Sequence, residues 1–316
     1  MAGKFEVIAA DITNNCNLRC VFCFNDFAGV KNHFITDDTF AKVISLLPLV
    51  DDGHFFFSCL YEPTIHPRFI DLLERIPPEL RQKVFFTTNL TTKISDDSLD
   101  RLSRIGIHHI NISMDSLRPE VFESLRKGAR FDRYMNNLER LVGRFAANTG
   151  AGAPPIHYVT VALRPNIEEI PALVEECSTR FLAAINEARW IYWGSHERPA
   201  GYSLEWKRRY LASNKQWKKL QKFARKTKLR FILEPPPPNY FEEDGADYSR
   251  SDGKAGWADL PLGLSVASSG KAYMIGHPEV NFDLGEIDDP LSFFQERAGE
   301  LMSLPKTQFR REAMYR

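Results

Sequence analysis

The 316-residue chain is long enough for one large domain, or for a large domain joined to a small one. Hydrophobic residues make up 43% and charged residues 26% of it, and Lys+Arg equals Asp+Glu at 41 each, so no basic field points to a nucleic-acid partner. No apolar run approaches the length of about eighteen residues that a membrane span needs. The first residues also lack the basic-then-apolar layout of a signal peptide. We therefore expect a globular, cytoplasmic protein without a membrane or nucleic-acid partner.

Strand and helix patterns alternate from the N-terminus onward. Apolar runs rich in β-branched and aromatic residues predict strands, and stretches with apolar residues on one face predict helices. The predicted strands are residues 5–12, 54–58, 84–88, 109–114, 156–163 and 188–192. The predicted helices are residues 36–47, 67–75, 96–104, 119–127, 132–147, 167–181 and 204–228. Such alternation predicts an α/β fold with a parallel sheet and right-handed crossovers.

Three of the five cysteines, Cys16, Cys20 and Cys23, lie in one short loop after the first predicted strand. An odd number of cysteines is a poor disulfide framework and favours a reducing compartment. Three thiolates can converge on one inorganic centre and leave one of its metal positions open. A closed structural zinc or iron–sulfur site would recruit a fourth Cys or His nearby. The alternatives are a zinc site completed by His33, and thiols that are structural or redox-active.

The spacing CxxxCxxC, with the aromatic Phe22 before the last cysteine and an apolar strand before the loop, resembles the radical S-adenosylmethionine (SAM) superfamily. The resemblance implies a partial (β/α)6 TIM-like barrel, in which the chemistry lies at the carboxyl ends of the strands. It implies that Cys16, Cys20 and Cys23 bind one 4Fe–4S cluster and that SAM chelates the fourth iron. An external donor such as flavodoxin or ferredoxin then supplies the electron.

Two strand ends resemble SAM-binding segments of this superfamily. Residues 58–64 (SCLYEPT) occupy the place where many members carry Gly-Gly-Glu-Pro, whose backbone carbonyl holds the SAM amino group. This chain keeps Glu62 and Pro63 but has Leu-Tyr instead of the glycines. Asn89 ends the third predicted strand, where the superfamily often has Thr-Asn-Gly. The resemblance implies that the Glu62 segment and Asn89 hold SAM; a plain turn and an Asx-turn are the alternatives.

The fourth predicted strand ends in a segment that resembles the Ser-x-Asp pattern of the superfamily. Alternation along a strand puts Ser113 and Asp115 on the same side. The resemblance implies that both bind the ribose hydroxyls and carboxylate of SAM, and that Arg126 faces the SAM carboxylate. A helix cap by Asp115 and a surface position for Arg126 are the alternatives.

Two isolated cysteines and one polar segment bear on the substrate. Cys59, at the end of the second strand, is the candidate donor of a hydrogen atom if the reaction is an epimerisation. Cys177 lies in a predicted helix and is expected in the core. Residues 190–198 mix aromatic and polar side chains, which suits a sugar, a nucleoside or a peptide.

The C-terminal third predicts an extension, so the expected domains are a barrel at 1–229 and a small α+β domain at 230–316. A proline-rich segment at 234–239 and an acidic loop at 242–254 precede a hairpin that turns near Gly270. This layout resembles the SPASM or Twitch extension of many radical SAM enzymes. Residues 178–316 contain no cysteine, so we expect no auxiliary cluster.

The resemblance implies an enzyme that reductively cleaves SAM to a 5′-deoxyadenosyl radical, which abstracts hydrogen from a substrate C–H bond. The lack of an auxiliary electron acceptor favours epimerisation, rearrangement, elimination or radical coupling. We expect tailoring of a sugar- or nucleoside-like molecule in specialised metabolism. The alternatives are modification of a ribosomally made peptide and, in another class, a non-catalytic zinc-binding or scaffold protein. The basic stretch 204–228 predicts a solvated face, or else a docking surface for an acidic partner.

Overall fold

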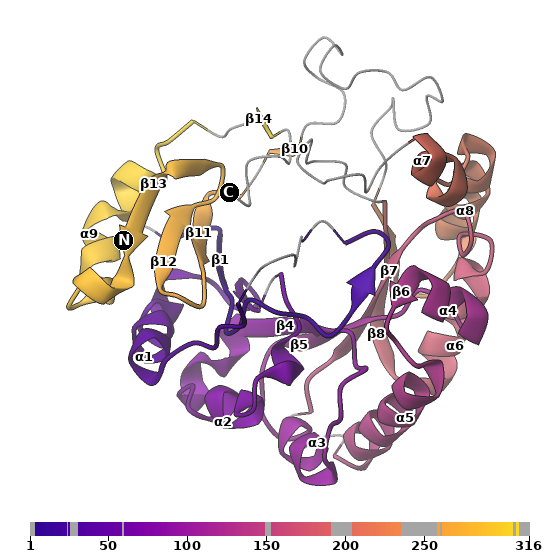
Figure 1. Ribbon diagram of the computed structural model, residues 1–316, viewed down its shortest axis with the longest axis horizontal. Helices are drawn as coiled ribbons and strands as arrows, with labels where there is room; N and C mark the ends of the chain where they lie inside the picture. Colours follow the sequence, from indigo (N-terminus) through magenta and orange to yellow (C-terminus); the bar gives the residue numbers. More distant parts are fainter. Residues whose placement is uncertain are drawn as a thin grey trace.

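The computed structural model describes residues 4–23, 25, 31–58, 60–148, 153–190, 204–234, 258–259, 261–305 and 308–309. A ten-stranded sheet in the order β13-β12-β11-β1-β3-β4-β5-β7-β8-β9 forms its centre. All pairs from β11 to β9 are parallel, and only β12 and β13 run antiparallel to their neighbours. The sheet curves into an incomplete barrel with helices on its outer side (Figure 1). The predicted α/β class and partial TIM-like barrel are confirmed.

The elements follow the predicted alternation closely in the first half of the chain. The parallel strands are β1 (Val7–Ala10), β3 (Phe55–Phe57), β4 (Val84–Thr88), β5 (His109–Ser113), β7 (Ile156–Val161), β8 (Ala183–Arg189), β9 (Phe231–Leu233) and β11 (Gly263–Val266). The helices are α1 (Asp37–Ser45), α2 (Phe69–Glu74), α3 (Asp96–Leu102), α4 (Pro119–Leu125), α5 (Phe131–Ala147), α6 (Ile170–Arg180), α7 (Leu204–Tyr210), α8 (Asn214–Lys226) and α9 (Pro290–Leu301). Short 3₁₀ turns span Leu47–Leu49, Pro63–Ile65, Pro78–Lys83 and Leu284–Glu286. The remaining strands are β2 (Arg19–Cys20), β6 (Arg126–Lys127), β10 (Ala258–Asp259), β12 (Lys271–Met274), β13 (His277–Asp283) and β14 (Gln308–Phe309).

Alternation along the strands divides the sheet into two faces. Phe55 and Phe57 are buried toward the helices, and the Phe57 ring meets that of Phe40 in α1 at 6.1 Å. Phe56 therefore faces the barrel interior. There it begins a row of stacked rings that crosses four neighbouring strands, near their amino ends. The ring centroids are 4.5 Å apart from Phe56 to Phe85, 4.5 Å from Phe85 to His109 and 4.2 Å from His109 to His157.

Two predicted helices end differently from expectation. The helix expected at 119–127 ends at Leu125, and the next two residues form β6, which pairs antiparallel with β2. The helix expected at 204–228 is two helices, α7 and α8. The break occurs because Ser213 caps α8 in a capping box with Gln216, which satisfies amide groups that a continuous helix would have bonded internally. Both expectations were therefore wrong in their boundaries.

The strand expected at 188–192 was also misplaced. It begins at Ala183 and ends at Arg189, while residues 191 and 192 lie outside the described residues. Polar side chains alternate along it: Asn186 is buried against α6, where its Nδ2 donates to Ser178 Oγ at 3.0 Å, and Glu187 lies on the opposite face. An apolar run was the wrong criterion for a strand in which one face is polar.

The C-terminal hairpin continues the barrel sheet. β11 pairs parallel with β1, and β12 returns antiparallel through the predicted turn, in which Gly270 has a φ of 92°. Gly263 is needed for this contact, because a Cβ there would lie 2.0 Å from the Val7 carbonyl oxygen. Figure 1 shows β11–β13 and α9 beside β1 and α1. The domain boundary at 229/230 and the SPASM-like character of this region stay predictions. No helix in the described part of the chain is long and apolar enough to cross a membrane.

Candidate active site

The cysteine loop leaves β1 and is held at two places. A bridge between Thr13 and Phe34 closes its base. Further along, the β2–β6 ladder places Cys20 opposite Arg126, and the Val21 N–H donates to the Leu125 carbonyl at 2.9 Å. The loop therefore depends on the segment that follows α4, and this ladder was not foreseen from sequence.

The three thiols of the loop are half-buried and act electrostatically on one another. Two N–H groups point at Cys16 Sγ, from the Leu18 backbone at 3.5 Å and from Asn89 Nδ2 at 3.6 Å. Burial raises the pKa of Cys16 to about 11 and that of Cys20 to about 12. Cys16 and Cys20 are therefore neutral without a metal, and metal binding has to displace their protons.

Asp115 and Arg126 form an ion pair beneath the loop. Arg126 Nε lies 2.7 Å from Asp115 Oδ2, and both side chains are buried. Asp115 Oδ1 accepts a bond of 2.8 Å from the Val161 N–H at the end of β7. On its other side, the Arg126 guanidinium lies 5.4 Å from the centre of the Phe22 ring, and its Nη1 is 4.0 Å from Cys20 Sγ. The two residues predicted to bind SAM thus pair with each other and connect β5 and β7 to the cysteine loop.

Glu62 is the centre of a second buried network. Its carboxylate accepts bonds from the backbone N–H and hydroxyl of Thr64, from the Thr88 hydroxyl at 2.7 Å and from the Asn89 N–H at 2.6 Å. Burial raises the pKa of Glu62, and these donors oppose the rise. The Glu62 side chain therefore connects the segments that follow β3 and β4. Because its carboxylate is occupied by these donors, a SAM contact in this segment would have to come from the backbone.

Asn89 connects the end of β4 to the cysteine loop. Its Oδ1 accepts from the Thr91 N–H at 2.9 Å, which is the Asx-turn that was expected as an alternative. Its Nδ2 donates to Asn17 Oδ1 at 2.9 Å, in addition to the contact with Cys16. The turn directs the Asn89 side-chain amide nitrogen toward the cysteine loop. The Asx-turn and a position beside the predicted site are therefore compatible.

Sequence reasoning missed Asp11 and Tyr61. Asp11 Oδ1 accepts from the Leu60 N–H at 3.0 Å, so this carboxylate holds the segment after β3 against β1. Burial raises the pKa of Tyr61 to about 12, and Asp11, Tyr273 and Cys23 add to the rise. Tyr273, in β12 of the C-terminal hairpin, is therefore close enough to Tyr61 to act on it electrostatically. An acidic residue at the end of an apolar strand was the available signal for Asp11.

The other predicted residues have mixed outcomes. Ser113 is half-buried at the carboxyl end of β5. Cys177 is buried in α6 with its Sγ 3.5 Å from Met114 Sδ, which confirms it as a core residue. Trp190 is buried, whereas Cys59 and residues 191–198 lie outside the described residues.

The zinc alternative gains no support from the geometry. His33 Nδ1 lies 3.1 Å from the Ser268 hydroxyl. Among the residues that the structure describes, no three His, Cys, Asp or Glu side chains, those of Cys16, Cys20 and Cys23 included, are already grouped as metal ligands, so this observation favours neither zinc nor a cluster.

Comparison with known families decides the class of the protein. Residues 11–177 match the model of the Radical SAM superfamily. The chain belongs to this superfamily. It is therefore a radical SAM enzyme, and members of the superfamily bind a 4Fe–4S cluster and SAM.

Relatives and solved structures agree with that assignment. The GTP 3′,8-cyclase of Chlorobaculum tepidum is 30% identical over 173 residues, covering 54% of this chain and 49% of the cyclase. A tungsten-containing aldehyde ferredoxin oxidoreductase cofactor-modifying protein of Pyrococcus furiosus is 25% identical, covering 52% of this chain and 45% of that protein. The chain thus spans about half the length of the curated relatives it matches.

Solved radical SAM structures share the fold of nearly the whole chain. Streptococcus suis SuiB bound to S-adenosylmethionine has a TM-score of 0.62 at 16% identity, covering 96% of this chain and 68% of SuiB. The enzyme anSMEcpe with bound AdoMet has a TM-score of 0.56 at 16% identity, covering 93% of this chain and 83% of that protein.

Proposed function

We propose that Cys16, Cys20 and Cys23 hold one 4Fe–4S cluster and that the chain uses it to cleave SAM reductively and abstract hydrogen from a substrate C–H bond. The observation that carries the proposal is the set of three half-buried thiols at the carboxyl end of β1, with N–H donors directed at Cys16 and a guanidinium beside Cys20. Hydrogen bonds to ligand sulfurs and nearby charge are the means by which proteins tune such clusters. With SAM bound, the cluster would supply a hydrogen-abstracting radical.

The protein's own part is to position and to shield. The Asp115–Arg126 pair supports the cysteine loop from below, and the Glu62 network fixes the turn that carries Asn89. We assign SAM to the space around Asn89, Ser113, Asp115, Arg126 and the backbone near Glu62. Stacked rings, most of them only half-buried, line the barrel interior near the amino ends of the same strands and give it an apolar surface there.

The substrate proposed first is a small sugar- or nucleoside-like molecule. Polar side chains face the barrel interior above the stacked rings. Asn111 Nδ2 lies 3.3 Å from Thr87 Oγ1, and Arg189 forms a bidentate pair with Glu187 at 2.6 and 2.8 Å. Such alternating donors and acceptors suit hydroxyl and ring-nitrogen groups. The relatives named GTP 3′,8-cyclase support a nucleoside-like molecule, and a redox-neutral outcome fits the absence of cysteine from residues 178–316.

A ribosomally made peptide is the second candidate. It is favoured by the fold shared with SuiB, of which a structure bound to the precursor peptide SuiA has been solved. That structure and this chain have a TM-score of 0.57 at 18% identity.

Anaerobic reconstitution tests the proposal directly. The chain should bind about four iron and four sulfide ions, and it should form 5′-deoxyadenosine from SAM and dithionite. Cys16→Ala, Cys20→Ala and Cys23→Ala should each lose both properties, whereas Cys177→Ala, a matched change in the core, should keep them. A panel of deuterated nucleosides, sugars and peptides then identifies the substrate by deuterium transfer into 5′-deoxyadenosine. Stoichiometric zinc without iron, or no 5′-deoxyadenosine, would overturn the proposed cleavage of SAM by this chain and favour a zinc-binding or scaffold role of the cysteine loop.

A further inference from the structure

One part of this electrically neutral chain is strongly basic. Residues 204–230 contain eleven Lys and Arg residues and one acidic residue, Glu205, although the whole chain has 41 of each sign. Six of the eleven lie on α8, which has no acidic residue: Lys215, Lys218, Lys219, Lys222, Arg225 and Lys226. We call the exposed side of α8 that carries these residues the basic face.

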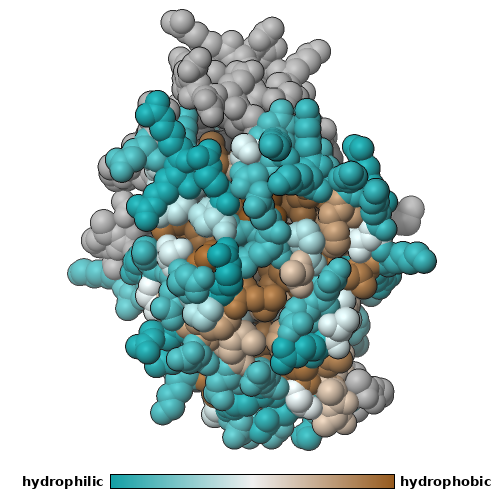
Figure 2. All heavy atoms as spheres, turned by 90° about the vertical axis from the view of Figure 1, so that its right-hand side faces the viewer, coloured by the Kyte–Doolittle hydropathy of each residue, from teal (hydrophilic) through white to brown (hydrophobic). Residues whose placement is uncertain are grey.

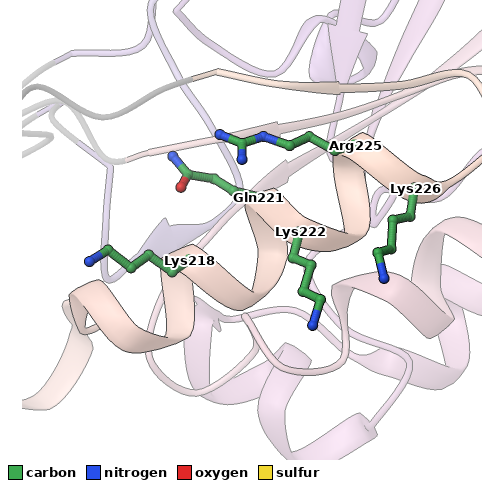
Figure 3. Close-up of a pocket in the computed structure, with 5 residues that line it drawn as sticks. All are labelled: Lys218, Gln221, Lys222, Arg225 and Lys226. Carbon is green, nitrogen blue, oxygen red and sulfur yellow. The ribbon is translucent and has the colours of Figure 1, made fainter.

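The basic face is free of ion pairs over most of its length. Its six cationic side chains belong to exposed residues. Among the described residues, the structure pairs just one of them, Lys219, whose Nζ lies 3.3 Å from Glu168 Oε1. Lys218, Gln221 and Arg225 extend to one side of the helix and Lys222 and Lys226 to the adjacent side, where they line an open hollow (Figure 3). Like charges so closely spaced repel one another, so the helix is stabilised when an anionic surface covers them.

The opposite side of α8 is connected to the cysteine loop. Trp217 and Leu220 of α8 are buried in a hydrophobic cluster that also contains Tyr210 of α7, and Val21 and Phe22 of the cysteine loop pack against that cluster. Trp206 of α7 donates from Nε1 to the Val21 carbonyl at 3.1 Å. Figure 2 shows the side of the molecule that carries these helices, where hydrophilic side chains surround hydrophobic ones. A protein seated on the basic face thus lies against helices that pack on the loop holding the thiols.

We propose that the basic face of α8 docks the electron donor, a small acidic protein that carries a low-potential one-electron cofactor. This inference rests on the proposed function, because a reductively driven reaction needs such a donor. In the docked complex the donor would lose one electron and an oxidised cluster held by the cysteine loop would gain it, with no bond made or broken. Opposite charges would speed the encounter and orient the two proteins.

A nucleic acid is the competing anionic partner, and the geometry favours it less. Single-stranded nucleic acids are held by exposed aromatic rings interleaved with basic groups. The aromatic residues of α8, Trp217 and Phe223, pack into the hydrophobic cluster instead of lying on the basic face.

Charge reversal on α8 tests the proposal in the full chain. The variant Lys218→Glu/Lys222→Glu/Arg225→Glu is compared with Arg104→Glu/Arg133→Glu/Lys271→Glu, which makes the same charge change at exposed positions outside α8. Cluster reduction by photoreduced flavodoxin is followed by stopped-flow absorbance, and dithionite serves as the donor that needs no docking. We expect the α8 variant to be reduced by flavodoxin at least about tenfold more slowly, with a weaker dependence on salt. We expect the control variant to behave like the unmodified chain, and all three proteins to form 5′-deoxyadenosine equally with dithionite.

The outcomes separate the two proposals. Equal rates with flavodoxin in the α8 variant and the control would overturn the docking surface while leaving the proposed function intact. RNA binding by the unmodified chain that only the α8 variant loses, together with unchanged flavodoxin rates, would assign the face to nucleic acid. No SAM cleavage by the unmodified chain with dithionite would overturn the proposed function and the docking inference together.

Discussion

The two ends of the barrel interior are built from different chemistry. At the carboxyl ends of the strands, buried charges and hydrogen bonds hold the site together, through Asp115–Arg126 and through Glu62 with its donors. Near the amino ends, stacked rings from Phe56 to His157 line the interior. Directional bonds fix groups in place but leave costly unpaired charges when one partner is lost, whereas ring packing fills space and tolerates more change. The comparison predicts that substitutions at the carboxyl ends of the strands affect both folding and the cluster. Substitutions near the amino ends should affect folding alone.

The largest effect is expected from breaking the buried ion pair. Arg126→Met leaves the Asp115 carboxylate buried without its partner, which typically costs about 3–5 kcal/mol. Urea unfolding should show this loss, and iron retention after reconstitution should fall because the loop is held through β6. The double variant Asp115→Leu/Arg126→Met should recover much of the stability but not the iron retention.

An exposed pair supplies the control for that experiment. Lys219 and Glu168 are both largely exposed, with side chains 63% and 62% accessible, so Lys219→Met should cost less than about 1 kcal/mol. Equal losses in Lys219→Met and Arg126→Met would contradict the role given to the buried pair.

A smaller loss is expected at Glu62. Glu62→Ala leaves the Thr88 hydroxyl and the Asn89 N–H without their acceptor, and we expect a cost of about 2–3 kcal/mol. Because Asn89 is held by this bond, the spectrum of the reconstituted cluster in the presence of SAM should change too. Glu62→Gln keeps one carbonyl acceptor, so its stability and its cluster spectrum should lie between those of Glu62→Ala and the unmodified chain. A spectrum that is identical in all three proteins would refute the positioning role of Glu62.

Near the amino ends of the strands, a substitution should change the stability of the fold only. Phe85 stacks on Phe56 and on His109, so Phe85→Leu loses two ring contacts and should cost about 1–2 kcal/mol. Iron content and 5′-deoxyadenosine formed per cluster should be unchanged. A loss of cluster activity larger than the loss of folded protein would show that the two ends are coupled, against the comparison above.

The sequence allowed the barrel and the cysteine loop to be predicted because their signals are local. Apolar runs, turn residues and a three-cysteine spacing can be found without knowing what pairs with what. The pairing of β11 with β1 joins residues more than 250 positions apart, and its one local trace is Gly263. The β2–β6 ladder is two residues long on each side, too short for any periodicity. The capping box at Ser213 and Gln216 was readable and was overlooked.

The residues of the site were predicted as contacts to SAM, and the structure shows what each one does within the protein. Asp115 and Arg126 were each predicted to contact SAM, and their pairing with each other was not considered. A side chain that crosses from one strand end to another has no signature in either segment. The same limitation hid Asp11, which directly follows β1 but holds the segment that follows β3.

The smallest effect is expected on the stability of the fold at low pH, through His109 at the amino end of β5. Burial, with His157 and His108 adding to it, lowers the pKa of His109 to about 3. An unfolded chain has a histidine pKa near about 6.5, so between these values the unfolded state binds more protons and stability falls as the pH is lowered. We expect this group to remove about 1 kcal/mol between pH 7 and pH 5.5, measured as the shift of the urea midpoint. His109→Gln should flatten that slope, whereas His54→Gln, at an exposed position, should not. An unchanged slope in His109→Gln would mean that the stack of rings does not hold this imidazole neutral.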